Sequence, residues 1–295
     1  MVTLVCPVRG CGAPLSRDGR ALVCPRGHRF DGARSGYHNL LQPQERRSRR
    51  PGDSAAALAA RRRLFDRGHG DWLVPHLLAA VDALRLPPGA AVLDVGCGEG
   101  FYLGTLARER RIDAHGLDIS APAVDLAARR HPQATWIVGN ADRTLPYAAG
   151  SFDLALALTS RVDPGELRRV LAPAASFVLA VPAADDLVEL RAAVLGEGRL
   201  RDRLRPALAS LAAQFELVRH VTVRTRLQLD AADARDLLAA TYRGVRHRER
   251  RRADGLLEPA APATAGDRGE VAESAPIDVT ASRDLATLRP RLPRL

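Results

Sequence analysis

A strand that runs directly into a glycine-rich turn constrains the fold of this chain more than any other feature. Residues 92–100 read Val-Leu-Asp-Val-Gly-Cys-Gly-Glu-Gly. The aliphatic half is typical of a buried parallel strand. Gly96, Gly98 and Gly100 allow a tight turn and a close approach of the backbone to a ligand. The spacing differs from the G-x-G-x-x-G of dinucleotide sites, so it predicts an α/β fold with another nucleotide-type cofactor. The alternative is an ordinary strand-to-helix turn.

Further strands and helices follow this turn in alternation. We expect a helix over 101–110, a strand over 114–118, a helix capped by Ser120, and strands over 135–138 and 151–158. Asp118, at the end of the second strand, lies about 20 residues beyond the glycine loop, where α/β folds place a carboxylate on ribose hydroxyls. The alternation predicts a Rossmann-like, mostly parallel sheet.

Three of the four cysteines fall within the first 24 residues. Cys6 and Cys11 form one short knuckle, and Cys24 and His28 form a second. Three thiolates and one imidazole are the ligand set of a closed structural zinc site. Between the knuckles, residues 14–23 predict a hairpin that turns at Asp18-Gly19. We therefore expect a zinc ribbon over 1–40; the alternative is that the cysteines are small core residues without metal.

Composition excludes some classes and favours one kind of partner. No apolar run approaches the ~20 residues that cross a bilayer, and no signal peptide is evident at the start, so we expect a cytoplasmic protein without membrane contact. The formal net charge of +10 favours a polyanionic partner. All 44 residues counted as lysine or arginine are arginine, however, so codon bias in a GC-rich genome is an alternative explanation of the charge.

Together these motifs resemble the class I S-adenosylmethionine (SAM) methyltransferases, and more narrowly the RlmA/TlrB family of 23S rRNA (guanine-N1)-methyltransferases. Beyond the cysteines and the glycine loop, the matching stretches are 28–31, 36–41, 47–55 and 60–69. Segment 51–55 is more similar to the Gram-negative, housekeeping RlmA branch. The resemblance implies methylation of N1 of a guanine in a 23S rRNA hairpin loop, with SAM and structural zinc bound, and it implies a homodimer.

The resemblance also implies a division of the chain. We expect a zinc ribbon over 1–40, an arginine-rich helical connector over 41–84, and a SAM-binding domain over 85–295 with a seven-stranded sheet. Segment 277–280 is expected to close that sheet as an antiparallel strand. Segment 256–275, rich in Ala, Pro, Gly and Glu, predicts a flexible insert after an arginine run at 246–252.

The site residues implied by the resemblance fall into three groups. The expected cofactor-binding residues are Gly70, Asp94, Gly96, Cys97, Gly98, Glu99, Gly100, Asp118, Asn140, Ala141 and Asp186. The expected metal ligands are Cys6, Cys11, Cys24 and His28. The expected RNA-binding residues are Arg46, Arg47, Arg49, Arg50, Arg61 and Arg62, and the alternative for the last two is a solvated helix face. No catalytic residue is assigned, and Ser160 and Asp163 are the candidates for a general base.

The chain departs from the family pattern at several points. Two extra residues separate Cys6 from Cys11, and residues 159–161 replace an aromatic-Ala-Pro segment at the substrate pocket. Gly70 stands where the family has tyrosine, and Asp186 aligns with a histidine. Two alternative functions therefore stay open: a SAM-dependent methyltransferase of another RNA or a small molecule, and a non-catalytic zinc-ribbon RNA-binding protein.

Overall fold

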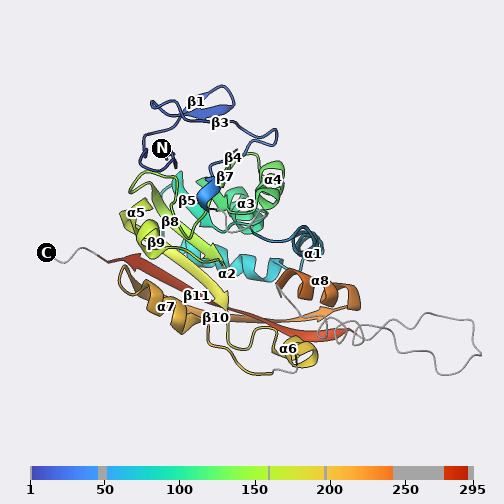
Figure 1. Cartoon of the computed structure of the whole chain (residues 1–295). Helices are drawn as coiled ribbons and strands as arrows, with labels where there is room; N and C mark the ends of the chain where they lie inside the picture. The colour runs from blue at the N-terminus through green and yellow to red at the C-terminus, as the bar shows by residue number, and fades with distance from the viewer. Residues whose placement is uncertain (1, 46–51, 159, 196–197, 242–275, 292–295) are drawn as a thin grey trace, which may run out of the picture.

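The computed structural model describes residues 2–45, 52–158, 160–195, 198–241 and 276–291. Its centre is an eight-stranded sheet with the order β10-β11-β9-β8-β5-β6-β7-β4 (Figure 1). The strands are β4 (His38–Asn39), β5 (Ala90–Val95), β6 (Ile112–Asp118), β7 (Thr135–Val138), β8 (Phe152–Leu158), β9 (Leu171–Pro182), β10 (Phe215–Leu229) and β11 (Ile277–Pro290). Strand β11 is antiparallel to both neighbours, and the remaining pairs are parallel. The predicted Rossmann-like sheet is confirmed, with β4 as an additional edge strand.

Helices cover both faces of this sheet. The helices are α1 (Ala55–Asp66), α2 (Val74–Asp82), α3 (Phe101–Glu109), α4 (Ala121–Arg130), α5 (Pro164–Val170), α6 (Val188–Leu195), α7 (Leu204–Leu211) and α8 (Ala231–Thr241), with short 3-10 turns at η1 (Pro43–Glu45) and η2 (Asp71–Leu73). Along β5, Leu93 and Val95 belong to one apolar cluster and Val92 to another. Burial on both faces explains why this parallel strand is continuously aliphatic.

The strands expected from the sequence are present with small shifts in their ends. The expected helix cap is also present, because Ser120 Oγ accepts a hydrogen bond from the Ala123 amide at 3.4 Å. The expected closing strand at 277–280 is antiparallel, as predicted, but it continues to Pro290 and lies between β9 and β10. The short predicted segment underestimated it because the 14-residue strand alternates irregularly between buried and partly exposed positions.

The N-terminal ribbon is a three-stranded antiparallel sheet made of β1 (Ser16–Asp18), β2 (Ala21–Val23) and β3 (Arg29–Phe30). The predicted hairpin is present, and its turn is formed by Gly19 and Arg20, one residue later than expected. The chain then continues into β4, which pairs in parallel with β7. The ribbon therefore lies beside the β4 edge of the large sheet, opposite the edge formed by β10 (Figure 1).

Part of the expected arginine-rich surface lies outside the described residues. This applies to Arg46, Arg47, Arg49 and Arg50, to the run 246–252 and to the segment 256–275.

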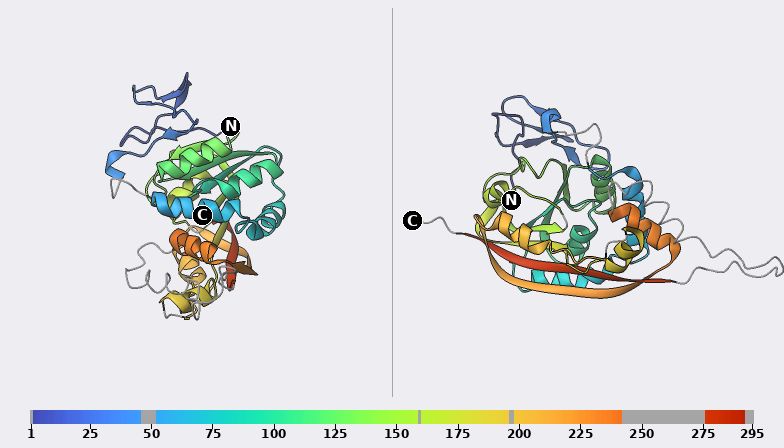
Figure 2. Two further views of the ribbon diagram at one scale, coloured as in Figure 1. Left: turned by 90° about the vertical axis from the view of Figure 1, so that its right-hand side faces the viewer. Right: turned by 60° about the horizontal axis from the view of Figure 1, so that its bottom comes forward.

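Helix α8, which follows β10, lies across α1 (Figure 2). The Asp236 carboxylate accepts hydrogen bonds from Arg63 Nε at 2.9 Å and from Arg67 Nη2 at 2.8 Å. Asp233, one helical turn earlier, contacts His69 Nε2 at 2.7 Å. A helix from the C-terminal half of the chain is thus held to α1 and to the residues that directly follow α1.

We expect Asp236→Asn to lower the free energy of unfolding by about 1–2 kcal/mol, because two arginines lose a largely buried acceptor. The Arg63 hydrogen bond, followed by the Arg67 hydrogen bond, holds the pKa of Asp236 below its ordinary value. A lowered acid pKa stabilises the fold above the unfolded pKa, and that contribution is lost as the pH falls through the folded pKa. The difference between variant and wild type should therefore shrink in acid, as measured by urea denaturation.

Asp82→Asn is the matched control, because Asp82 also accepts from an arginine, Arg110, at 2.7 Å, but its side chain is 49% exposed. We expect this exposed pair to contribute less than about 1 kcal/mol. An equal loss of unfolding free energy in the two variants would contradict the expectation that the contact between α1 and α8 stabilises the fold.

Candidate functional site

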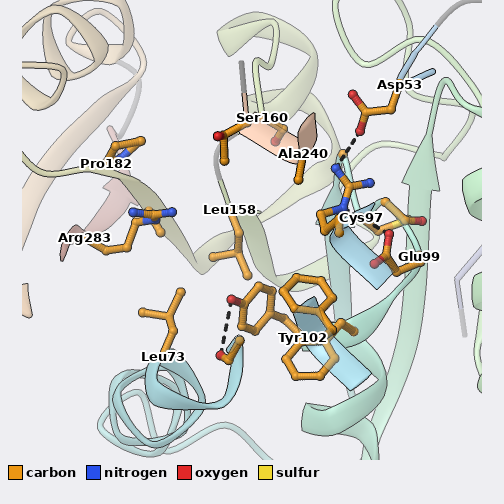
Figure 3. Close-up of a pocket in the computed structure, with 18 of the residues that line it drawn as sticks. Asp53, Leu73, Cys97, Glu99, Tyr102, Leu158, Ser160, Pro182, Ala240 and Arg283 are labelled. Carbon is orange, nitrogen blue, oxygen red and sulfur yellow. Dashed lines mark hydrogen bonds and ion pairs between the residues drawn. The ribbon is translucent and has the colours of Figure 1, made fainter. Parts of the chain in front are cut away.

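A cavity of about 930 Å³ opens where the parallel strands end. Asp94, Asp118, Leu158 and Pro182, at or near the carboxyl ends of β5, β6, β8 and β9, all line it. Helices α1 and α8 and strands β10 and β11 contribute further residues to the wall (Figure 3). The carboxyl ends of the strands are the usual ligand position in open α/β sheets.

The glycine loop forms one wall, and its glycines are required by geometry. Gly96 and Gly100 have φ angles of +75° and +74°, in the left-handed region. A Cβ at Gly96 would lie 2.2 Å from Ser160 Cβ, and one at Gly100 would lie 2.4 Å from the Trp136 ring. Because glycine has no Cβ, these two positions can adopt this backbone conformation without displacing Ser160 or Trp136.

Asp118 is held rigidly at the end of β6. Its Oδ2 accepts from the Gly98 amide at 3.0 Å and its Oδ1 from the Ser120 amide at 2.8 Å. Burial raises the pKa of this carboxyl, and the backbone hydrogen bonds oppose that shift. A carboxylate has about four acceptor positions, so two remain for the hydroxyls of a ligand.

Four side chains that line the cavity each have a buried polar atom without a partner among the described residues: Asp94 Oδ1, Glu99 Oε1, Arg61 Nη2 and Arg191 Nε. Asp94 and Glu99 are only 3% and 2% exposed. Burial, followed by the charge of Asp118, raises the pKa of Asp94 to about 7. Buried polar groups in proteins are normally hydrogen-bonded, so this set indicates a ligand with both donors and acceptors. A SAM molecule, with its ammonium, sulfonium, carboxylate and ribose, fits that requirement and the glycine cradle.

The structure brings nearly all expected cofactor residues to this cavity. Those that line it are Gly70, Asp94, Gly96, Cys97, Gly98, Glu99, Asp118, Asn140, Ala141 and Asp186. Gly100 does not line the cavity; it lies where Trp136 and Ala127 pack. The Asn140 amide nitrogen donates to the Glu45 carbonyl at 3.0 Å, so this residue also anchors the chain that leaves the ribbon.

The two general-base candidates have different surroundings. Ser160 lines the cavity, and its hydroxyl donates to the Val95 carbonyl. Asp163 is not among the lining residues; it caps α5 by accepting from the Glu166 amide at 2.8 Å. Asp163 is therefore engaged in holding a helix end, which sequence spacing alone did not reveal.

The sequence interpretation missed an aromatic wall. Phe65 stacks on Phe101 with ring centroids 4.3 Å apart, and Tyr102 packs edge-on against both. Trp72 lies 6.0 Å from the guanidinium of Arg283. Aromatic residues make up only 4% of the chain. The occurrence of four of them, Phe65, Trp72, Phe101 and Tyr102, close to the glycine loop in the sequence was the signal that could have predicted this wall.

Arg61 and Arg62, both expected to bind RNA, face different surroundings. Arg61 points into the cavity, where its Nη1 donates to Asp53 at 2.6 Å and its Nε to Glu99 at 3.1 Å. Arg62 is half exposed and lies 3.5 Å from Asp66. A helix turns by about 100° per residue, so neighbouring arginines point in different directions.

The four expected metal ligands meet in the ribbon. The ligand atoms of Cys6, Cys11, Cys24 and His28 all lie within 4.8 Å of one another. The sulfur atoms of Cys11 and Cys24 are 3.8 Å apart, and His28 Nδ1 lies 3.4 and 3.3 Å from those of Cys6 and Cys24. Sulfur ligands about 2.3 Å from a tetrahedral zinc lie about 3.8 Å apart, so the set fits zinc.

The two extra residues in the first knuckle are absorbed by a backbone turn. The Cys11 amide donates to the Val8 carbonyl at 2.8 Å, which folds the longer loop back toward Cys6. The departure from the family spacing therefore does not move Cys11 away from the cluster.

Among the described residues, no helix is long and apolar enough to span a bilayer.

Comparisons with known proteins agree with both sites. A model of a methyltransferase domain matches residues 92–178, and a model described as RlmA, N-terminal, matches residues 4–49. A solved structure from Bacillus halodurans C-125, provisionally assigned as a methyltransferase, superposes with a TM-score of 0.50 at 16% identity, covering 72% of this chain and 97% of that one. At that identity the similarity concerns the fold alone.

Two curated relatives extend the similarity over most of the chain. The 23S rRNA (guanine(748)-N(1))-methyltransferase of Streptomyces fradiae is 40% identical over 234 residues, covering 77% of this chain and 80% of the relative. A Micromonospora griseorubida protein, provisionally named a 23S rRNA (guanine-N(1)-)-methyltransferase, is 36% identical over 252 residues, covering 77% and 81%. With its SAM-type cavity and its Cys₃His ribbon, the chain belongs to the RlmA/TlrB family of 23S rRNA (guanine-N1)-methyltransferases.

Proposed function

We propose that this protein transfers a methyl group from SAM to N1 of a guanine in a hairpin loop of 23S rRNA. One observation carries the proposal: a single chain of this family combines the glycine-loop cavity with a zinc-type ribbon. The relative from Streptomyces fradiae carries that activity in its name. The methyl group, already activated on a sulfonium, is supplied by SAM, so the protein contributes mainly alignment.

In this proposal each cofactor residue binds a different part of SAM. Asp118 would accept from the ribose hydroxyls of SAM, and the loop 96–98 would hold its methionine part. Asp94 lies behind the loop and balances positive charge. Guanine N1 carries a proton that it must give up to a base or to water before or during the methyl transfer that SAM would supply. The base must be unpaired, which a hairpin loop supplies at low cost.

The guanine belongs, in our proposal, on the side of the cavity opposite the glycine loop. Pro182 and Arg283 lie there, across the cavity from Cys97 and Glu99 (Figure 3). Arg283 packs near Trp72, and both kinds of side chain stack on unpaired bases. Ser160 and Arg161 line the cavity where the family has its aromatic-Ala-Pro segment.

Several finer assignments belong to the same proposal. We propose that the ribbon and the connector arginines other than Arg61 contact rRNA, and that the chain divides at about residues 40 and 84. We also propose a homodimer, which the family resemblance implies and light scattering tests, and a cytoplasmic location, which the sequence composition favours. Segment 51–55 supports the housekeeping branch, for which deletion of the gene should leave macrolide sensitivity unchanged.

Methylation of an unmodified 23S rRNA transcript tests the proposed function. With tritiated SAM, we expect label in the RNA and a new primer-extension stop at one guanine, because N1 methylation blocks pairing. Label in another RNA but not in 23S rRNA would favour the alternative acceptor. Tight RNA binding without any SAM affinity in calorimetry would favour a non-catalytic RNA-binding protein.

The pH dependence of SAM binding tests the placement of Asp94. Its pKa is raised to about 7, so in the free protein this carboxyl stabilises the fold at low pH and loses that contribution as the pH rises toward 7. A cationic ligand favours the ionised form. We therefore expect SAM affinity to rise about tenfold from about pH 6 to pH 8 and then to level off. Calorimetry in buffers of different ionisation enthalpy should detect proton release near pH 6.

The control for this prediction is Asp94→Asn, which removes the titrating group and keeps the side-chain shape. Its SAM affinity should be lower and nearly independent of pH. The same pH slope in this variant would assign the titration to another group, and a flat wild-type profile would contradict the placement altogether.

A further inference from the structure

Arg61 and Glu99 form a linked pair in which each side chain leaves one polar atom without a partner. Arg61 Nε donates to Glu99 Oε2 at 3.1 Å, and Arg61 Nη1 donates to Asp53 at 2.6 Å. Arg61 Nη2 and Glu99 Oε1 are buried and have no partner among the residues that the structure describes. One is a donor only and the other, when ionised, is an acceptor only.

The position of the pair places both free atoms at the glycine loop. Arg61 Nη2 lies 3.4 Å from where a Cβ at Gly98 would lie. Glu99 follows Gly98 in the chain, and all three residues line the cavity. In Figure 3, Asp53, Cys97 and Glu99 lie together on one side of the cavity.

We propose that this pair binds the α-amino acid group of SAM, with Arg61 Nη2 donating to the carboxylate and Glu99 Oε1 accepting from the ammonium. The inference rests on the proposed function, because it assumes that SAM occupies this cavity with its methionine part over the loop. A guanidinium must donate, and the carboxylate is the anionic group of SAM. The free donor thus suits the carboxylate of SAM, and the free acceptor suits its ammonium. The two protein atoms belong to one linked pair, as the two charged groups belong to one amino acid group.

The charges around the pair support this orientation. Asp53 and Glu99 hold the Arg61 guanidinium from two directions, which fixes its plane before a ligand arrives. A donor fixed in advance loses little conformational freedom on binding. The Arg61 side chain is 24% exposed and that of Glu99 2%, so their contacts to a ligand are little screened by water.

Arg283 is the main alternative for the carboxylate. Its Nη1 lies 2.6 Å from Asp186, and it lies across the cavity from Cys97 and Glu99 (Figure 3). A carboxylate bound there would direct the methionine part away from the glycine loop. Arg61, which comes from the connector helix α1, is therefore the better-placed arginine, and the connector completes the cofactor site.

Binding measurements with ligands that differ only in the amino acid group test this inference. We expect calorimetry on the wild-type protein to give a SAM affinity about 10- to 100-fold above that of decarboxylated SAM, the range for a hydrogen bond to a charged group. Arg61→Met should lower the affinity for SAM and S-adenosylhomocysteine by a similar factor. It should change the affinity for decarboxylated SAM and 5′-methylthioadenosine by less than about twofold.

Arg129→Met is the control, because Arg129 is 64% exposed, pairs with Asp125 at 2.8 Å and does not line the cavity. It should leave all four affinities unchanged. An equal loss for all ligands in Arg61→Met would assign Arg61 a structural role and overturn the inference. If that variant does not fold, the wild-type comparison still decides: equal affinity for SAM and decarboxylated SAM overturns it. Absence of binding of every ligand to the wild type would instead count against the proposed function.

Discussion

Replacement of Cys24 by serine is expected to release zinc and to lower methylation of 23S rRNA by at least about 100-fold, while SAM affinity stays within about threefold. The three ribbon strands have only three, three and two residues, too few to form a stable core alone. A structural zinc site contributes on the order of 10 kcal/mol to the folding of such a unit. Removal of one of four ligands should therefore unfold the ribbon.

The cavity should survive this change because no described residue before Gly52 lines it. Zinc content by mass spectrometry, SAM binding by calorimetry and methyl transfer to rRNA separate the three effects. Cys97→Ser is the control for zinc content, since Cys97 lies in the glycine loop and outside the metal cluster. Full methylation by a zinc-free Cys24→Ser protein would show that the ribbon is dispensable for rRNA recognition.

Gly96→Ala is expected to lower the free energy of unfolding by about 2–5 kcal/mol, from left-handed backbone strain together with overpacking. The added Cβ would lie 2.2 Å from Ser160 Cβ and 2.9 Å from its Oγ. Ser160 is also held by the Val95 carbonyl, so it cannot move without breaking that hydrogen bond. The loop should therefore shift, and SAM affinity should fall by more than about 100-fold, because the strand end and the loop move together.

Two further variants separate the strain from the clash. Gly150→Ala has a similar φ of +67° but no atom within 4 Å of the added Cβ, so it should cost only about 1–2 kcal/mol and leave SAM affinity unchanged. The double variant Gly96→Ala/Ser160→Gly removes the clashing side chain and should recover part of the lost stability. Equal behaviour of Gly96→Ala and Gly150→Ala in both measurements would contradict the role of close packing at the loop.

The nucleotide-type half of the fold could be predicted because its signals are local. The aliphatic run before Gly96, the acidic end at Asp118 and the cap at Ser120 each occupy a few consecutive residues. The zinc ligands are equally local, since two short knuckles joined by a hairpin must bring four ligands together. These elements lie within two residues of their predicted ends, and the extension of β11 to Pro290 is the main exception.

The features of the site that the sequence did not predict depend on contacts between segments that lie far apart in the chain. Nothing near Arg61 in the sequence indicates that it meets Glu99, 38 residues later, or that Asp236 reaches Arg63 across 173 residues. Arg61 and Arg62 belong to one arginine run, yet the helix directs one into the cavity and leaves the other half exposed. The role of Asp163 as a helix cap could not be predicted either. An aspartate shortly after a strand can face the substrate or cap the next helix, and the sequence does not distinguish these two positions.

Mapping of methylguanosine by mass spectrometry in 23S rRNA, from cells with and without this gene, tests the proposed activity most directly. We expect one N1-methylguanosine in a hairpin loop of wild-type rRNA, its loss on deletion, and its return with the intact gene but not with the Cys24→Ser variant. An unchanged set of methylguanosines after deletion would contradict 23S rRNA guanine N1 as the acceptor.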